Sequence, residues 1–593
     1  MANEQHVVRS VSWNEVFSFT HVFKSFKMAI HPSKIVLAFL AIFLTYAWGR
    51  ALDVVWTGVS DSNWVQKDEP WAYWTAESRA AFKLRKQEWL EQDRANSLRN
   101  LLREYPAAVP TPEKMAKADF WSNYKRLEEQ YEKTYQEQLK RAEEAELDAL
   151  KEAKDLPKEE WQAKKAQAHR DRLRAQRQEL QNYAARCEGL RGVRGRRIFS
   201  AFGEWQTRCI GNAVGAVRRG NIATGLGKLY ERRGSMIPAA YRVATVTSKT
   251  EFDASTDAPE GYGLLAWLAM SAWGLWWLVS SYPIYSLFLL PVALAIWAVL
   301  GGAICRIAAL HAAREEKISI MAAVKFGLSK FLSFVSAPLL PLAIIVLLGL
   351  LVALGGAAGA LPYFGEWFVA LLFGLALMLA AVVTFLAIGL VAGWPLMWPT
   401  IAVEGSDSFD SISRSFSYVW ARPFRYGLYW LVAGVYGTIC YLFVRLFAFL
   451  LLGATHCWAG WAMRLADRPQ YAEGAGKLDV MWARPTFECF HGPMQFEAMK
   501  NASEKAASVV LAFWVYVVSA VVLAFLVTFF FSAATNIYYL LRQKVDATDL
   551  DDVYVEEAEA EEAAAPPAEE QPEEQPPAEE KPAEEEGEEE TSE

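Results

Sequence analysis

The chain has 593 residues, of which 53% are hydrophobic and 22% are charged, and its formal net charge is −8. This mixture excludes an average soluble globular domain, because the apolar residues gather in runs that can cross a bilayer core of about 30 Å. The charge divides as well, since residues 551–593 carry −19 and the remainder carries +11. We therefore expect an all-α, polytopic helical membrane protein with a soluble insertion and an acidic tail.

Residues 1–34 are predicted to form an amphipathic interfacial segment ahead of a first span over residues 35–52. Ser12 and Glu15 have the spacing of a capping box, in which two side chains satisfy backbone N–H groups at a helix start. The span is too long and too far from the first residue for a cleaved signal peptide, so we expect a retained anchor.

Residues 53–261 form the predicted soluble insertion, whose Glu, Lys, Arg, Gln and Ala content is typical of long solvated helices. Thr111-Pro112 and Leu156-Pro157 each put a proline at a first helical position. An apolar stripe favours a helical hairpin over a coiled-coil homodimer, although both remain open. The stripe consists of Phe120, Tyr124, Leu127, Tyr131, Tyr135, Leu139 and Ala142.

The end of this insertion, residues 191–233, is strongly basic and is interleaved with aromatic residues. Nucleic acid is one partner for such a run. Because membrane spans lie nearby in the sequence, anionic lipid headgroups are the better interpretation, and we expect no nucleic-acid partner.

Residues 262–541 are predicted to form the transmembrane domain. The five spans predicted after the first are 283–305, 334–358, 367–396, 427–455 and 508–540. Residues 262–281 are apolar enough to span but are rich in Trp, as an interfacial segment is. Basic residues flank alternate ends of the spans, which favours six crossings, cytoplasmic termini and an extracytoplasmic insertion. A seventh crossing by residues 262–281 would move the N-terminus to the outside.

The stretch WPTIAVEGSDSFDSISRSFSYVWARPFRYGLYW, residues 398–430, separates two of these spans. Its apolar residues recur every three or four positions, which predicts an amphipathic helix lying in the headgroup plane with its aromatic face toward the lipid. Asp407 is the predicted N-cap, and Arg422 ends the helix before a proline. We call this an elbow helix, and its signature residues are Glu404, Gly405, Asp407, Asp410, Arg414 and Arg422.

The pattern recurs in residues 318–334, and a shift of 92 residues aligns Ile320 with Ile412 and Phe326 with Tyr418. The face predicted to be apolar consists of Met321, Val324, Leu328 and Phe331. Together with the N-terminal segment, these two stretches give three copies of the same order of elements: an amphipathic helix, a turn with basic residues and a membrane span. This indicates a weak internal repeat.

The segment TIAVEGSDSFDSISRSFSYVWARPFRY, within residues 283–455, resembles the polytopic membrane domain that occurs beside some bacterial glycerophosphodiester phosphodiesterases and in many uncharacterised bacterial membrane proteins. The resemblance implies a helical membrane domain in the bacterial inner membrane. The catalytic barrel of those phosphodiesterases is absent from the sequence, so the resemblance implies no hydrolase activity.

Candidate chemistry is sparse. Arg445 is expected to be the one charge deep in a span, where charges are costly and often functional. Cys457 and Cys489 share a loop with His456 and His491, and a disulfide is favoured over a zinc site because the ligand spacing is irregular. We expect no catalytic, cofactor-binding or metal site.

Residues 542–593 are rich in Glu, Ala and Pro and are predicted to be disordered. The sequence favours a non-enzymatic membrane protein of scaffold type, acting in envelope organisation through its insertion or through self-association. A transporter or channel built on paired helices, and an accessory to lipid metabolism, remain as alternatives.

Overall fold

The computed structural model describes residues 18–554 with gaps, the longest of which are 104–119, 225–261, 467–475 and 493–498. Over this described part the protein is all-α, and its only β-type pairing is an isolated bridge between Val65 and Arg196. The predicted N-terminal capping box and most of the acidic tail lie outside the described residues. So do the predicted helix start at Pro112 and the side chain of His491.

Seven of the described helices are long and apolar enough to cross a membrane. They are α3 (Pro32–Val59), α12 (Leu264–Ser281), α13 (Pro283–Arg314), α15 (Phe331–Ala358), α16 (Phe364–Glu404), α18 (Pro423–Ala466) and α20 (Ala502–Val545). The sequence predicts six of these spans and favours an interfacial position for the remaining helix, α12. Its 18 residues and apolar composition meet the requirement for a span.

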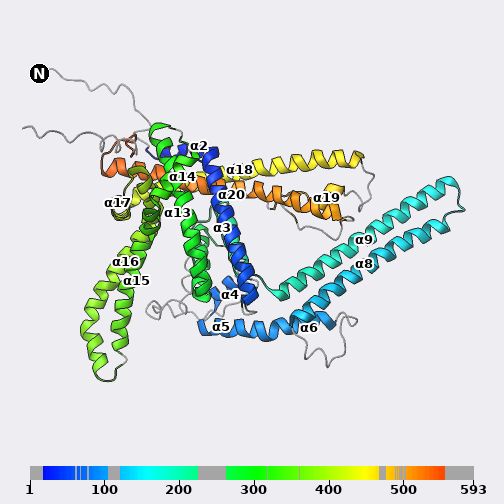
Figure 1. The fold of residues 1–593 in the computed structure, drawn as a ribbon, viewed down its shortest axis with the longest axis horizontal. Coiled ribbons are helices and arrows are strands. Elements are labelled where there is room, and N and C mark those ends of the chain that lie inside the picture. Colours follow the sequence, from blue (N-terminus) through cyan, green and yellow to red (C-terminus); the bar gives the residue numbers. More distant parts are fainter. Residues whose placement is uncertain are drawn as a thin grey trace, which may run out of the picture. The chain divides into compact units, whose positions relative to one another are not determined.

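Three of these helices, α13, α16 and α20, contact one another and form an inner trio (Figure 1). Their C-terminal portions are buried, as Ala303, Ile401 and Ile537 show with no exposed surface. The other helices pack around the trio, α3 against α13 and α20, α15 against α16, and α18 against α20. Small residues such as Gly301 permit this packing, because a Cβ there would lie 2.6 Å from the Trp398 ring.

Each inner helix carries a short amphipathic helix, namely α14 (Ile320–Ser329) on α13, α17 (Ser408–Ala421) on α16, and α2 (Lys24–Ala29) on α20. Each of the three leads directly into an outer helix, namely α15, α18 and α3 respectively. The repeat predicted from sequence therefore corresponds to three similar units. In the third unit the inner helix comes last in the chain and the other two elements come first.

The elbow helices pack on the inner helices through small residues, and several large apolar residues of their predicted stripes are exposed. In α17, Ser411 and Ser415 have no exposed surface, whereas Phe409 is 68% exposed. The serines allow close approach to α16, where Ser411 Oγ donates to the Met397 carbonyl at 2.7 Å. In α14, Met321 is likewise 77% exposed. The aromatic and aliphatic stripes thus point away from the described protein, as a face that contacts lipid would.

The insertion begins with short helices and continues into a long hairpin (Figure 1). Its helices are α4 (Glu69–Thr75), α5 (Arg79–Glu88), the π-helical turn η3 (Trp89–Asp93), α6 (Arg94–Arg103), α8 (Phe120–Glu152), α9 (Lys158–Arg194) and α10 (Ile198–Arg218). The break predicted at Pro157 is confirmed, since this proline precedes the first residue of α9. The predicted stripe is also confirmed, because Tyr124, Leu127, Tyr131 and Tyr135 are buried against α9.

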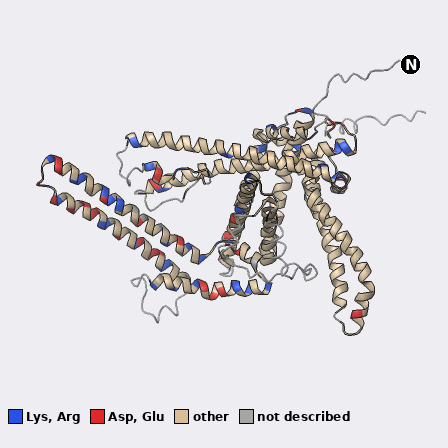
Figure 2. Cartoon of the chain, turned by 180° about the vertical axis from the view of Figure 1, so that it is seen from behind, with Lys and Arg blue, Asp and Glu red and all other residues tan. Residues whose placement is uncertain are grey.

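Figure 2 shows that acidic and basic residues line the whole length of the α8–α9 hairpin, while the hairpin of α15 and α16 carries almost none. The α8–α9 hairpin therefore has a charged surface that suits water, whereas the α15–α16 hairpin has an apolar surface that suits lipid.

Contacts between neighbouring helices show the relative directions in which these helices run. α3 and α13 are antiparallel neighbours, since Asp53 contacts Tyr285 at one end and the rings of His31 and His311 lie 5.9 Å apart at the other. α10 and α12 are also antiparallel, with Trp205 Nε1 donating to the Met270 carbonyl. α10 therefore runs back along α12, although α10 is not among the described helices that are long and apolar enough to cross a membrane.

Candidate functional site: buried charge at the two ends of α13

Glu404, the last residue of α16, lies at the centre of a charged cluster near the C-terminal end of α13. Its side chain is 9% exposed and forms ion pairs with Arg414 at 2.8 Å and Arg542 at 3.1 Å. Tyr538 donates a hydrogen bond to the same carboxylate. Helices α16, α17 and α20 therefore meet at one buried anion. We call these four residues the elbow cluster.

The remaining signature residues surround the elbow cluster. Asp407 caps α17 as predicted, accepting from the Asp410 backbone N–H at 2.9 Å, and Asp410 pairs with Arg414 at 2.9 Å. Gly405 has a φ of +64°, which favours glycine, and its carbonyl accepts from Lys330 Nζ at 2.5 Å. Arg422 ends α17, as predicted, and its side chain is exposed and takes no part in the cluster.

Burial and charged partners together set the pKa values of Arg414 and of the neighbouring Tyr418. Burial lowers the pKa of Arg414, but its bond to Asp410 and the charge of Glu404 outweigh this and raise the pKa above its ordinary value. Burial raises the pKa of Tyr418, and its bond to Asp546 adds to the effect. Both groups therefore keep their protons throughout the physiological range. The cluster joins helices firmly and offers no acid–base pair near neutral pH.

The opposite end of α13 contains a second buried anion, Asp53 of α3. The carboxylate is 1% exposed and accepts from the backbone N–H groups of Phe199 at 2.8 Å and Ser200 at 3.2 Å. The Ser200 hydroxyl, at 2.9 Å, and the Tyr285 hydroxyl, at 3.1 Å, also donate, and the partly exposed Arg50 lies 3.9 Å from the same carboxylate as a long ion pair. One carboxylate thus binds the start of α10 and the start of α13 to the end of α3.

Glu69, the first residue of α4, forms a similar contact with α12. It is 1% exposed and pairs with Lys86 of α5 at 3.3 Å. Tyr282 donates to it at 2.9 Å and Trp277 Nε1 at 3.3 Å. Burial and the charge of Glu69 raise the pKa of Tyr282 well above its ordinary value, so this phenol remains a donor. We call Asp53, Glu69 and their partners the junction.

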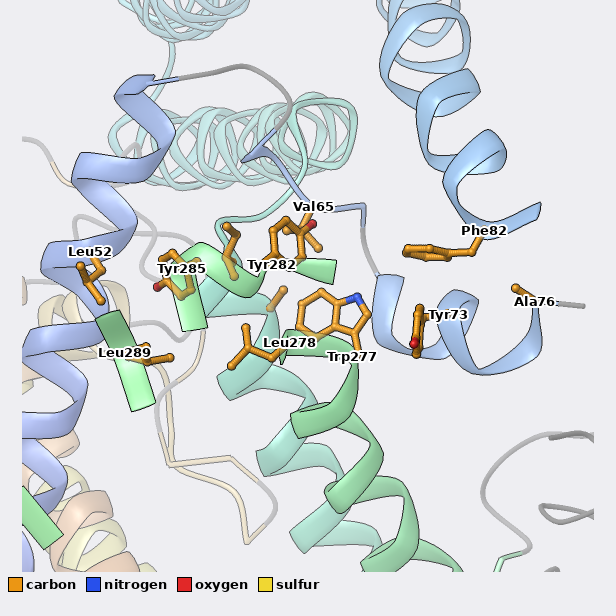
Figure 3. Packing of buried hydrophobic residues seen from close by; sticks show 12 residues of the cluster. Leu52, Val65, Tyr73, Ala76, Phe82, Trp277, Leu278, Tyr282, Tyr285 and Leu289 are labelled. Atoms are coloured by element: carbon orange, nitrogen blue, oxygen red, sulfur yellow. The ribbon is translucent and has the colours of Figure 1, made fainter. Parts of the chain in front are cut away.

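An apolar cluster surrounds the junction (Figure 3). Trp277, Tyr285 and Val65 are almost fully buried there, and Tyr73 packs edge-on against Phe82 with ring centres 5.0 Å apart. The cluster takes side chains from α3, α4, α5, α10, α12 and α13. The insertion is therefore packed onto the spans and is not held by a linker alone.

Arg445 is not the deepest charge. Its guanidinium is half-buried, donates to the Phe487 carbonyl and to the Tyr441 hydroxyl, both at 3.0 Å, and lies near the Phe487 ring. Several other charges in the spanning helices are more buried, among them Lys34 with no exposed surface and Arg306 at 5%. Sequence reasoning treated both as flanking charges, because their partners are far apart in the sequence.

Lys34 and Arg306 have neutral partners. Lys34 Nζ donates to the Ser532 hydroxyl at 3.3 Å, and Arg306 Nη1 donates to the Ala402 carbonyl at 2.9 Å. Arg306 also lies 4.6 Å from the centre of the Phe326 ring. Both cations hold inner helices to their neighbours. Ser532 is one of several small polar residues in this span, and such residues were the sequence signal for a buried polar contact.

The disulfide predicted between Cys457 and Cys489 is not formed, and both residues are exposed. Cys489 lies in a turn closed by Thr486, whereas Cys457 lies on an outer face of α18. His456, the neighbour of Cys457, points inward and contacts the Trp482 carbonyl at 3.1 Å. Over the described chain, no group of three or more metal-ligating side chains is assembled.

An apolar cavity of about 1020 Å³ lies among the spans. It is lined by residues of α13, α15, α16, α18 and α20, with Val214 of α10 at its edge. Trp394, Trp398 and Trp430 form part of its wall. Such a surface suits hydrocarbon chains and offers a charged solute no partner.

Comparisons of the chain with models of known protein families, with curated proteins and with solved structures found no match.

Proposed function

We propose that the protein is a non-enzymatic scaffold of the bacterial inner membrane, which holds the α8–α9 hairpin as an extracytoplasmic interaction element with both termini in the cytoplasm. The observation that carries the proposal is the junction. Buried carboxylates and an aromatic cluster attach the insertion to three spanning helices, so a force or partner acting on the hairpin acts on the membrane domain. A flexible tether would need no buried anion, whose desolvation is costly.

The outer surface of the hairpin suits protein contacts. α8 and α9 use their aromatic residues in the seam between them, where the Tyr135 and Tyr183 rings stack with centres 4.8 Å apart. Acidic and basic residues recur along both helices (Figure 2), and most of them are exposed. Complementary charge on a partner would set the register and orientation of binding.

Site-specific photo-crosslinking in cells tests the scaffold proposal. The full-length chain carries a photo-reactive residue at Gln136 or Gln178, which are exposed on α8 and α9, or at Leu371, which is exposed on α16 as the control. We expect discrete protein adducts, either with a partner or with a second copy, from the first two positions only. Diffuse or absent adducts at both hairpin positions would refute the proposal.

Cysteine labelling tests the orientation. With all six native cysteines replaced by Ser, single cysteines at Gln136, Ser413 and Ser592 are treated with an impermeant thiol reagent in intact cells. We expect label at position 136 and none at positions 413 and 592. Label on positions 413 and 592 from opposite sides of the bilayer would contradict the predicted topology.

The apolar cavity favours a second candidate, an accessory function in lipid metabolism. Its volume of about 1020 Å³ accommodates acyl chains, and its tryptophans provide rigid apolar walls. Co-purification of a stoichiometric lipid that is lost on Gly434→Trp would support this function. Gly434 lines the cavity and a Cβ there meets no neighbouring atom, so the larger side chain would fill part of the cavity.

A further inference from the structure

A second cavity, of about 590 Å³, lies beside α2 at the C-terminal ends of α13 and α20. Its wall is polar and carries charges of both signs. The lining residues that matter here are Lys24, Lys27, Glu315, Asn536, Asp549 and Asp551. The lysines come from α2, whereas the carboxylates follow the ends of α13 and α20.

These opposite charges line the same cavity without pairing. In the described chain, Lys24 and Lys27 form no ion pair with Glu315, Asp549 or Asp551. His21 adds little positive charge, because burial and the neighbouring Lys24 lower its pKa. The positive side of the cavity is therefore the two lysines. A ligand that carries both an anion and a cation would satisfy both sides at once.

The cavity is placed where a membrane amphiphile can reach it. α2 is one of the three elbow helices, and Phe23 and Ile30 at its two ends are 43% and 45% exposed. One turn along α20 from the cavity residue Asn536, Ser532 binds the buried ammonium of Lys34. Polar groups thus continue inward from the cavity, while apolar groups flank it.

We propose that this cavity binds the phosphoethanolamine headgroup of a membrane phospholipid. The phosphate lies against Lys24 and Lys27, and the primary ammonium lies against Asp549, Asp551 and Glu315. A purely anionic headgroup would meet three carboxylates, which repel it. A quaternary ammonium has no N–H to donate to them, whereas a primary ammonium donates three hydrogen bonds.

Native mass spectrometry of the full-length protein in detergent tests the assignment. Dioleoyl phosphatidylethanolamine, phosphatidylglycerol and phosphatidylcholine are offered in turn at equal concentration. We expect the ethanolamine lipid to bind more tightly than the other two by about tenfold. Equal binding of the three lipids would overturn the proposal.

Two double variants divide the site into its halves. Lys24→Gln with Lys27→Gln removes the phosphate contacts and should reduce retention of the ethanolamine lipid by about tenfold. Asp549→Asn with Asp551→Asn should abolish the preference for this lipid over phosphatidylglycerol. An acidic double variant that keeps the full preference would contradict the ammonium assignment.

Matched controls remove the same charge at other positions of the chain. Lys325→Gln with Lys544→Gln changes two lysines that do not line the cavity, and Glu556→Gln with Glu557→Gln changes two carboxylates that follow Asp551 in the sequence. Both controls should leave the preference unchanged, and loss of it in either would show a general surface-charge effect and overturn the site. Free phosphoethanolamine should compete weakly. Competition equal to that of the lipid would overturn the assignment to a phospholipid.

Discussion

The junction and the elbow cluster each bury a carboxylate at an end of α13, but they stabilise it with different partners. Asp53 in the junction is held by backbone N–H groups and hydroxyls, whereas Glu404 in the elbow cluster is held by two guanidinium groups and a phenol. Neutral donors fix geometry without adding buried charge. Paired charges join separate helices, but removal of one partner leaves the other charge buried without that partner, which is destabilising.

This difference fits what each site joins. Asp53 organises the first turn of α10, where unsatisfied backbone N–H groups already favour an anion. Glu404 lies at the C-terminus of α16, where the helix dipole disfavours an anion and cations must offset it. The position of a carboxylate on its helix therefore explains which partners surround it.

Removal of Glu404 should have the largest effect, because it leaves Arg542 and Arg414 without their shared anion. We expect Glu404→Ala to lower the free energy of unfolding by about 3–5 kcal/mol. Thermal unfolding of the purified protein in detergent measures the change. Glu366→Ala, which removes an exposed carboxylate from the same helix, is the control and should have almost no effect. Equal effects of the two variants would show that the cluster contributes little.

Removal of Asp53 should have a smaller effect, because the buried groups left behind are neutral and the side chain of the cation beside it, Arg50, is 43% exposed to solvent. We expect Asp53→Ala to cost about 3 kcal/mol, since it leaves several buried donors without an acceptor. Cys209 of α10 reports the change locally. Burial raises the pKa of this thiol to about 12, so it should resist alkylation at pH 8 in the wild type.

In Asp53→Ala, loosening of α10 should increase the alkylation rate of Cys209 at least tenfold, while the exposed Cys457 reacts at an unchanged rate. Asp148→Ala, in an exposed ion pair of α8, is the control. Unchanged protection of Cys209 would mean that the apolar cluster alone holds the insertion.

Gly405 tests the backbone of the elbow cluster without altering its charges. Its φ of +64° lies in the region that side chains with a Cβ disfavour. Gly405→Ala should therefore cost about 1 kcal/mol, measured by the same thermal unfolding. Gly374→Ala is the control, because a Cβ there meets no neighbouring atom. A larger loss from Gly374 would indicate that detergent contacts dominate the measurement.

Local sequence patterns predicted the elements with local causes. The Asp407 cap, the end of α17 at Arg422 and the tyrosine seam of α8 all follow from spacing within one or two helical turns. The packing face of α17 could not be predicted from local spacing, because serines that bond to a neighbouring helix look like solvent-facing residues in a helical projection.

The junction could not be predicted in the same way. Asp53 binds residues 146 to 232 positions away, and no periodicity connects them. In the sequence it was one of several acidic residues flanking a span, so it was used only to infer orientation. Glu69 and Lys34 were missed for the same reason. The sequence around a polar residue that adjoins a span does not indicate which distant residues will bury it.

Asp479 provides the smallest and most local test, because it is an ion-paired carboxylate in a partly exposed setting. Burial raises its pKa, but the Gly476 N–H and the guanidinium of Arg464, at 2.5 Å, outweigh this and lower the pKa below its model-compound value of 3.8. A lowered pKa means that this contribution to stability is present above the unfolded pKa and is lost as pH falls through the folded value. We therefore expect the contact between α19 (Lys477–Met481) and the end of α18 to persist at pH 5 and to weaken below about pH 4.

Hydrogen exchange of α19 as a function of pH measures this loss, once the intrinsic exchange rates are corrected for pH. Asp479→Asn should remove the pH dependence, because the amide does not titrate. If protection in the wild type did not decrease below pH 4, the ion pair of Asp479 with Arg464 would contribute little. In that case the buried side chains of Leu478 and Met481 would hold α19 in place, as the apolar cluster would hold the insertion without Asp53.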